Sequence, residues 1–381
     1  MTPAARAAAA IQILDSILTG TPAEAALLRW SRASRYAGSG DRAAVRDLVF
    51  DSLRRRDSRA ALGGTLSGRG LILGMAREEG GDPDALFTGQ GHAAAPLTEA
   101  ERSAGHTPDA EQALDLPGWL HPAWRESLGD LARPVALAMR DRAPQWLRVN
   151  ALRATPAEAL ATLAAEGIAA EPHADLASAL RVTSGARRLT AAAAYRDGLV
   201  ELQDLSPQLA CAALPDAATV LDYCAGGGGK ALALAARGAR VTAHDAEARR
   251  MADLPIRAAR AGARIRIADA AALRQTYDLV LTDVPCSGSG TWRRTPDAKW
   301  RLQPADLDRL LAVQAQILDQ AAALVGPGGH LAYMTCSVLE AENGAQIRAF
   351  LDRSGFALRD QRRFTPLDAS DGFYLALLAR C

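Results

Sequence analysis

From Val200 to the end of the chain, short apolar runs alternate with segments of helical periodicity. The apolar runs lie at residues 219–222, 240–245, 264–268, 278–283 and 330–335. A chain that alternates in this way builds a parallel sheet with helices on both faces. The sequence therefore predicts a Rossmann-like α/β domain with a mostly parallel, doubly wound sheet over residues 200–381.

The rest of the chain follows other patterns. Residues 1–77 show only helical periodicity, which predicts an all-α domain. Residues 78–118 are rich in Gly, Pro and Asp, which predicts a loop or linker, and residues 119–144 fit a helical connector. Strand-like runs and one capped helix at residues 145–199 predict a small α+β module of RRM-like type. We therefore expect two smaller folded parts before the α/β domain.

The turn after the first predicted strand of the α/β domain is rich in glycine. In order, it contains Cys224, Ala225, Gly226, Gly227, Gly228, Gly229 and Lys230. Glycines at such a turn let the backbone approach a ligand, and the helix N-terminus that follows favours negative charge. The turn lacks the first glycine and the Ser or Thr of a Walker A loop, and it fits a dinucleotide fingerprint only loosely.

Three acidic residues follow the first three predicted strands. Asp222 and Asp245 are 23 residues apart, a spacing that fits S-adenosylmethionine, with the second acid on the ribose. Asp269 is placed to reach the adenine amine, although a helix cap or a solvated loop acid explains it almost as well. We therefore expect S-adenosylmethionine as the cofactor, bound by these three acids and the glycine-rich turn.

Two later strands end in segments that contain cysteine. Asp283-Val284-Pro285-Cys286 follows one strand, and Thr335-Cys336-Ser337 ends the other. The carboxyl ends of parallel strands line one crevice, so Asp283 and both thiols should meet there. C5 of a pyrimidine is a poor nucleophile unless a thiolate adds to C6, and this chemistry uses two thiols and an acid. The alternative for either cysteine is a small buried packing residue.

The remaining cysteines carry no such signal. Cys211 lies on an apolar helix pattern and Cys381 is the last residue. The spacing of all five fits neither a disulfide framework nor a CxxC metal site, so we expect no metal.

The basic residues are unusual in kind. Of 44 basic residues only Lys230 and Lys299 are lysines. Both fall in motif-like segments, which indicates that a compact ammonium group is needed at each position.

The overall charge restricts the partners. The net charge of +1 excludes a global basic field, so any RNA site must be a local patch. Candidate patches contain Arg54, Arg55, Arg56 and Arg59, then Arg187 and Arg188, then Arg293 and Arg294. No apolar run reaches membrane length, and the start of the chain lacks a signal-peptide pattern, so we expect a cytoplasmic monomer without a membrane partner.

At these motifs the chain resembles the Sun-type RNA 5-methylcytosine methyltransferases. The similarity covers residues 145–381 and is most specific at 283–300, at 335–337 and at 371–374. It implies that Cys336 attacks C6, that Cys286 assists product release and that Asp283 contacts the cytosine. It also implies that Lys230 closes the cofactor loop. The family usually has Ala-Pro where this chain has Gly226-Gly227.

The N-terminal part is similar, less specifically, to the NusB-like helical domain of the RsmB branch of that family, through residues 37–44 and 53–55. The resemblance implies S-adenosylmethionine-dependent methylation of cytosine C5 in RNA, with 16S rRNA as the expected substrate. The alternatives are a tRNA cytosine, a non-catalytic NusB-like RNA-binding factor, and a nicotinamide oxidoreductase.

Overall fold

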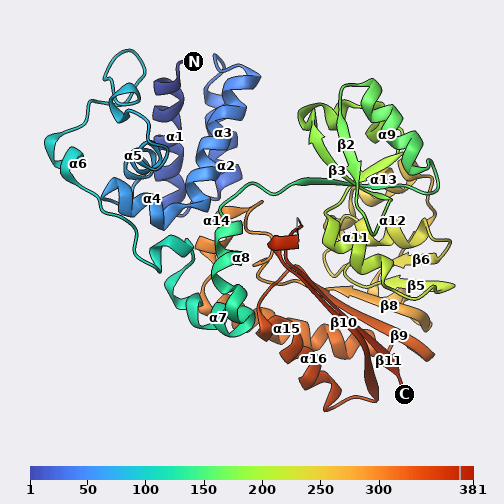
Figure 1. The fold of residues 1–381 in the computed structure, drawn as a ribbon. Helices are drawn as coiled ribbons and strands as arrows, with labels where there is room; N and C mark the ends of the chain where they lie inside the picture. The colour runs from blue at the N-terminus through green and yellow to red at the C-terminus, as the bar shows by residue number, and fades with distance from the viewer. Residues whose placement is uncertain (369) are drawn as a thin grey trace. The chain divides into compact units, whose positions relative to one another are not determined.

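The computed structural model describes residues 1–368 and 370–381. Contacts divide the chain into two compact units. One unit contains Met1–Arg142 and Trp292–Gln303, and the other contains Ala143–Thr291 and Pro304–Cys381. The first unit therefore takes a short segment from the middle of the α/β region (Figure 1).

The first unit is helical. Its longer helices are α1 (Pro3–Leu18), α2 (Ala23–Ala33), α3 (Ser39–Arg54), α4 (Arg56–Gly63) and α5 (Gly68–Glu78). Thr2 caps α1 by accepting a hydrogen bond from the Ala5 amide, and Pro3 occupies the first turn, where no amide hydrogen is needed. The helices enclose one apolar core that includes Leu14, Val49 and Ile72. The helical N-terminal region predicted from the periodicity is confirmed.

Residues 78–118 pack against this core. They contain η1 (Pro83–Ala85), α6 (Glu99–Ser103) and η2 (Gln112–Leu114). Phe87 and Leu97 from this stretch are buried in the core of the helical unit. The segment that was expected to be a loop or linker is therefore part of a folded unit, since Leu86 and Ala94 also pack on the core and the Arg77 guanidinium donates to carbonyls of this stretch.

The helical unit continues with η3 (Gly118–Leu120), α7 (His121–Leu128), η4 (Gly129–Leu131) and α8 (Ala132–Ala138), and it ends with the returning segment, which holds α14 (Pro296–Arg301). Trp292 stacks on Trp124 with 6.0 Å between ring centroids, and both side chains are buried. The Lys299 ammonium donates to the backbone oxygens of Arg54 and Asp115. These contacts fix the returning segment inside the first unit.

A four-stranded antiparallel sheet opens the second unit. Its order is β2-β3-β1-β4, built from β1 (Gln145–Val149), β2 (Ala169–Pro172), β3 (Ala179–Ser184) and β4 (Val200–Leu202). Helix α9 (Pro156–Ala165), which starts with the Thr155–Glu158 capping box, packs on it. Two short helical elements, η5 (Ala186–Ala191) and α10 (Ala193–Arg196), lead to β4.

The larger sheet has seven strands in the order β10-β11-β9-β8-β5-β6-β7. They are β5 (Thr219–Asp222), β6 (Arg240–Ala243), β7 (Ile265–Ile267), β8 (Tyr277–Asp283), β9 (Val325–Thr335), β10 (Phe356–Phe364) and β11 (Phe373–Arg380). Strands β5 to β9 pair in parallel, and β11 pairs antiparallel with β9 and β10. The predicted α/β class with a mostly parallel sheet is confirmed.

Helices accompany this sheet. They are α11 (Leu205–Ala212), α12 (Gly229–Ala235), α13 (Leu254–Ala261), α15 (Pro304–Ala322) and α16 (Gly344–Leu351), with short turns η6 (Ala248–Met251), η7 (Ala270–Ala272), η8 (Glu340–Glu342) and η9 (Pro366–Asp368). After β5 the chain runs outward through β6 and β7, then returns to β8 on the other side of β5. The strand order thus reverses between β5 and β8, the position where ligands bind in such sheets.

Candidate active site

The glycine-rich turn connects β5 to α12. Gly226 and Gly228 have φ of +50° and +77°, a backbone region that favours glycine. A Cβ atom on Gly228 would lie 2.2 Å from a methyl carbon of Leu254, so no larger residue fits there. The Arg257 guanidinium donates to the Gly227 carbonyl, and the exposed backbone of Gly227 faces solvent. The sequence therefore folds into an open turn at the amino end of a helix.

The acid at the end of the second strand braces this turn. The Asp245 carboxylate accepts hydrogen bonds from the Gly226 amide and the Glu247 amide, each at 2.9 Å. Arg250 also lies 3.3 Å from it. Each carboxylate oxygen can accept more than one hydrogen bond, so Asp245 can hold the turn and still receive a ligand hydroxyl.

Asp222, at the end of β5, is enclosed. Its side chain is 1% exposed, and neither carboxylate oxygen has a hydrogen-bond partner among the described residues. Burial raises the pKa of Asp222 to about 7, while the Lys230 charge opposes the rise and the Asp283 charge adds to it. A buried acid without a donor is suited to accept one from a ligand.

Asp269 is placed differently. It is exposed and caps η7 by accepting a hydrogen bond from the Ala272 amide at 2.9 Å. The structure thus gives Asp269 the helix-capping role that the sequence left as an alternative to adenine binding.

Lys230 and Asp283 form an ion pair at the place where the strand order reverses, between β5 and β8. Lys230 lies in the first turn of α12, and Asp283 ends β8. Burial alone would lower the pKa of Lys230, but the attraction of Asp283 prevails and the pKa lies above its ordinary value. The Asp283 side chain remains about one third exposed, at 31%. The pair therefore presents a carboxylate, held by a partly buried cation, at the carboxyl edge of the sheet.

The two motif cysteines lie side by side. The Sγ atoms of Cys286 and Cys336 are 3.3 Å apart, and both residues are partly accessible. The hydrogen bond with Cys336, followed by burial, holds the pKa of Cys286 well above its ordinary value. The structure thus brings Asp283, Lys230 and both thiols to neighbouring strand ends, as the strand-end motifs predicted.

A buried network that the sequence did not reveal surrounds the thiols. Glu342 is fully buried and accepts hydrogen bonds from Ser287 and Ser337, the residues that follow the two cysteines. The amide of Gln314 also donates to it, at 3.0 Å. A lone Glu after a predicted strand resembles any solvated loop acid, so only its partners identify it.

The other cysteines lie outside this arrangement. Cys211 is buried in α11, where burial raises its pKa to about 11. Cys224 is half-buried in the turn, and burial holds its pKa above the ordinary value. Cys381 is exposed. Within residues 1–368 and 370–381 there is no cluster of three or more His, Cys, Asp or Glu placed to hold a metal ion.

Several arginines proposed for RNA are structural. Arg54, Arg59 and Arg293 are buried. Arg59 pairs with Glu78 at 2.9 Å, and Arg54 donates to the Arg293 carbonyl at 2.7 Å. The RNA contact expected of Arg293 is therefore wrong. For Arg54 and Arg59, burial excludes both the phosphate contact and the solvated helix face that the sequence favoured, because a cluster of arginines in sequence does not show which members have internal partners.

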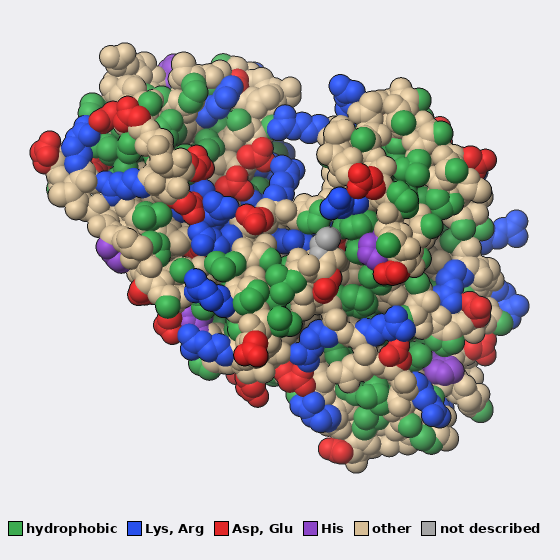
Figure 2. Space-filling view, viewed as in Figure 1, with side chains coloured by type: hydrophobic (Ala, Val, Ile, Leu, Met, Phe, Trp, Pro, Cys, Tyr) green, Lys and Arg blue, Asp and Glu red, His purple; other side chains and the backbone are tan. Residues whose placement is uncertain are grey.

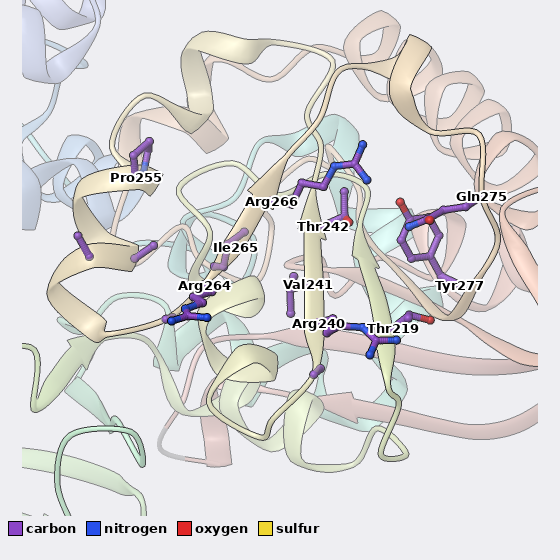
Figure 3. Close-up of a pocket in the computed structure, with 14 residues that line it drawn as sticks. Thr219, Arg240, Val241, Thr242, Pro255, Arg264, Ile265, Arg266, Gln275 and Tyr277 are labelled. Atoms are coloured by element: carbon purple, nitrogen blue, oxygen red, sulfur yellow. The ribbon is translucent and has the colours of Figure 1, made fainter.

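Neither the charge on the face in Figure 2 nor a prominent cavity in the sheet region marks the site. On the face in Figure 2, basic and acidic side chains are interspersed. A cavity of about 970 Å³ lies at the amino ends of β5 to β8, with Arg240, Arg264 and Arg266 in its lining (Figure 3). The thiols and the glycine turn lie at the opposite, carboxyl ends. No helix in the described part of the chain is long and apolar enough to cross a membrane.

Two family models match this chain. The model for 16S rRNA methyltransferase RsmB/F covers residues 210–379, and the model for the ferredoxin-like domain of RsmF/B-like methyltransferases covers residues 116–187. The first includes the glycine turn and both cysteine segments.

Curated relatives named ribosomal RNA small subunit methyltransferase B match this chain. The protein from Xanthomonas campestris is 37% identical over 290 residues, which cover 69% of this chain and 66% of the relative. The protein from Vibrio cholerae is 32% identical over 357 residues, which cover 86% of this chain and 78% of the relative. The matched region thus spans about two thirds of the Xanthomonas relative and more of the Vibrio relative.

Solved structures have the same fold. The structure of PH0851 has a TM-score of 0.74 at 22% identity and covers 99% of both chains. NSun6 from Pyrococcus horikoshii, solved with SFG, has a TM-score of 0.62 at 16% identity and covers 69% of this chain and 98% of its own. Together with the identity to the curated relatives, these matches show that the chain belongs to the RsmB/F, or Sun-type, family of RNA methyltransferases.

Proposed function

We propose that this protein transfers a methyl group from S-adenosylmethionine to C5 of a cytosine in RNA, with 16S rRNA as the substrate. The observation that carries the proposal is the 3.3 Å separation of the Cys286 and Cys336 thiols beside the Lys230–Asp283 ion pair. The printed names of the curated relatives support small-subunit ribosomal RNA as the substrate.

The residues around the glycine turn fit the cofactor. The buried carboxylate of Asp222 has no donor among the described residues and favours a cationic or hydrogen-bonding ligand group. Asp245 is placed to accept ribose hydroxyls beside the Gly226–Gly229 turn, whose backbone allows close approach. When bound, S-adenosylmethionine supplies an electrophilic methyl group.

The two thiols account for the chemistry at the base. The Cys336 thiolate adds to C6, which forms a C6–S bond and moves the C5–C6 π electrons to C5. After C5 has gained the methyl group, it carries both the methyl and its original proton. Cys286, which must first give its own proton to water because its pKa is raised, removes the C5 proton as thiolate, and the C6–S bond breaks as the C5–C6 double bond returns. The electron pair leaves with the sulfur of Cys336.

Asp283 orients the base in this scheme. Its partly exposed carboxylate is held by the Lys230 ammonium, so its free oxygen can accept or share a proton at the Watson–Crick edge of the cytosine. The high pKa of Lys230 keeps the ammonium charged throughout. The target base must leave its stack to reach this position.

Replacement of each thiol tests the proposal. Cys336→Ala should form no adduct and transfer no methyl group, because the C6 nucleophile is absent. Cys286→Ala should still attack and methylate, but it should retain the C5 proton and accumulate a covalent protein–RNA complex. That complex would appear as a denaturant-stable band shift that requires S-adenosylmethionine and 16S rRNA, with tRNA as the alternative substrate in parallel.

Control variants show whether an effect belongs to the two thiols. Cys381→Ala should behave as the native protein, and the Cys286→Ala/Cys336→Ala double variant should trap nothing. Trapping by Cys336→Ala alone would reverse the two roles. Retention of activity by both single variants would refute covalent catalysis through these thiols. Absence of methyl transfer by the native protein itself would leave a non-catalytic RNA-binding role.

A further inference from the structure

A fully buried carboxylate joins the two cysteine loops. The Oε1 atom of Glu342 accepts from the Ser287 amide at 2.7 Å and from the Gln314 amide at 3.0 Å. Its Oε2 atom accepts from the hydroxyls of Ser287 and Ser337. All four donors are neutral groups, and the Glu342 side chain is 0% exposed. Such a site is costly to build unless its hydrogen bonds are kept, because a buried carboxylate has lost its hydration.

The two loops depend on this carboxylate to different degrees. The loop with Cys336 has anchors of its own. Asn343 donates to the Ser337 carbonyl and accepts from the Thr335 hydroxyl, and the Cys336 carbonyl accepts from the Gly290 amide at 2.9 Å. These bonds hold the nucleophile loop without Glu342.

The loop with Cys286 relies on Glu342 and its neighbour. Ser287 gives two of its hydrogen bonds to Glu342, and Gln314 holds the Pro285 carbonyl at 2.9 Å while it also contacts Glu342. Farther along, the same loop is tied to the Cys336 loop by the Ser289 hydroxyl, which bonds the Ser337 hydroxyl and the Val338 amide, and by the Gly290 amide. The bonds at Ser287 and Pro285, on either side of Cys286, are the ones that involve Glu342 and Gln314, so removal of the carboxylate loosens the chain locally at Cys286.

We propose that Glu342 is a positioning residue that holds the Cys286 thiol against the Cys336 thiol, and so serves the release step of the reaction rather than the attack. The assignment to the release step rests on the proposed function. The clamp itself does not, because it concerns only the distance between two thiols.

Oxidative cross-linking measures the clamp without any methyl transfer. Diamide oxidises two adjacent thiols to a disulfide, taking up two electrons and two protons to become the hydrazine, and peptide mass spectrometry follows the Cys286–Cys336 link. The native full-length chain should cross-link readily. Glu342→Gln should cross-link about tenfold more slowly, because displacement by about 1 Å has effects of this size or larger. With its oxygen toward the Ser287 and Gln314 amides, the new amide turns its NH₂ group to the Ser287 and Ser337 hydroxyls, which must then accept, and all four hydrogen bonds lose the charge of the carboxylate.

A neighbouring carboxylate provides the matched control. Glu340 lies on the same turn, η8, and pairs with Arg348 and Arg363 instead of the cysteine loops. Glu340→Gln should therefore cross-link at the native rate. Ser287→Ala keeps Glu342 but removes the hydroxyl that bonds Glu342, Ser337 and the Ser289 amide. It should therefore also slow cross-linking, and it tests the clamp if Glu342→Gln fails to fold. A native rate in a folded variant at either Glu342 or Ser287 would overturn the clamp.

The reaction provides a second, separable measure. Glu342→Gln should methylate in a single turnover but release RNA slowly, and so accumulate the covalent complex as Cys286→Ala does. Its effect should vanish when it is combined with Cys286→Ala, because both act on one step. If the cross-linking differs as expected but no variant traps RNA, the clamp stands and the proposed function fails. If Cys286→Ala traps RNA while Glu342→Gln keeps both native rates, the function stands and the clamp fails.

Discussion

Individual residues at the carboxyl edge of the sheet differ sharply in environment despite their proximity. Asp222 is enclosed without a donor among the described residues, Asp245 is held by two backbone amides, and Asp283 is held by Lys230. The three acids therefore have different tasks available to them. The enclosed one resists ionisation, and the other two are held in place by their partners.

The enclosed acid predicts a pH dependence of stability. The pKa of Asp222 is about 7 in the folded state, well above its ordinary value of 3.8, so the folded protein retains a proton that the unfolded chain releases. The contribution of this group to the free energy of unfolding should therefore fall as the pH rises from about 4 to about 7, by at most about 1.4 kcal/mol per pH unit. Asp222→Asn should lack that loss. Denaturant titrations should show that the free energy of unfolding of the variant, relative to that of the native protein, is higher at pH 7 than at pH 5. The same difference at both pH values would refute the raised pKa of Asp222.

Asp245, which holds the glycine turn, predicts that its removal lowers the affinity for the cofactor. Asp245→Ala should weaken S-adenosylmethionine binding by about 1–3 kcal/mol, because it removes a charged acceptor and also frees the Gly226 amide. Asp278→Ala is the comparison, since Asp278 lies at the amino end of β8 and accepts hydrogen bonds from Thr219. Calorimetry on both folded variants should show the larger loss for Asp245. Unchanged affinity there would exclude Asp245 from the cofactor site.

Among the elements, the segment Trp292–Gln303 has the least expected position. It follows the cysteine loop in sequence, which suggested an RNA contact for Arg293, yet it belongs to the helical unit. Lys299 is 1% exposed there, and burial lowers its pKa to about 8. The compact ammonium that the sequence indicated at this position therefore serves packing and backbone hydrogen bonds.

This position changes the effect expected of a conservative substitution. Lys299→Arg should lower the free energy of unfolding by about 1.5–3 kcal/mol, because a planar guanidinium cannot replace the two buried bonds to the Arg54 and Asp115 carbonyls. Arg301→Lys, at a half-exposed position in the same helix, should be nearly neutral. Thermal unfolding of both variants tests this, and equal melting temperatures would show that Lys299 is replaceable.

The sequence predicted helices and strands better than it predicted which side chains contact one another. Strand runs such as 219–222 and 278–283 are recognisable by their apolar residues, and the topology of parallel strands then forces Asp283, Cys286 and Cys336 to one edge. The burial of Arg59 and the clamp at Glu342 depend on partners that are distant in sequence or in neighbouring loops. Their charge makes them resemble surface residues, so periodicity cannot identify them.

For the whole molecule, the net charge of +1 leaves little long-range attraction for RNA. With Arg54, Arg59 and Arg293 buried, the exposed members of the proposed patches include Arg187, Arg188 and Arg294. Binding should therefore rest on a few local phosphate contacts, with a shallow dependence on salt.

A charge substitution tests this distribution. The Arg187→Ala/Arg188→Ala variant should weaken RNA binding and reduce the slope of log affinity against log salt by about 1–2, because each phosphate that an arginine neutralises accounts for roughly 0.7–0.9 of that slope. Arg362→Ala, on the outer strand β10 and paired with Asp360, should leave the slope unchanged. Filter binding across a salt series distinguishes them. Equal slopes in all three proteins would place the RNA-binding surface elsewhere.

The returning segment has a consequence for the order in which the chain matures on the ribosome. Residues 1–142 emerge first, but Trp292, which stacks on Trp124, follows only after β1 to β8 have been made. The unit that is synthesised first is therefore not the first to be completed, in contrast to the usual N-to-C succession of domains. Until Trp292 has been made, the apolar surface around Trp124 stays uncovered in the nascent helices. During this interval the helices have the greatest need of chaperones.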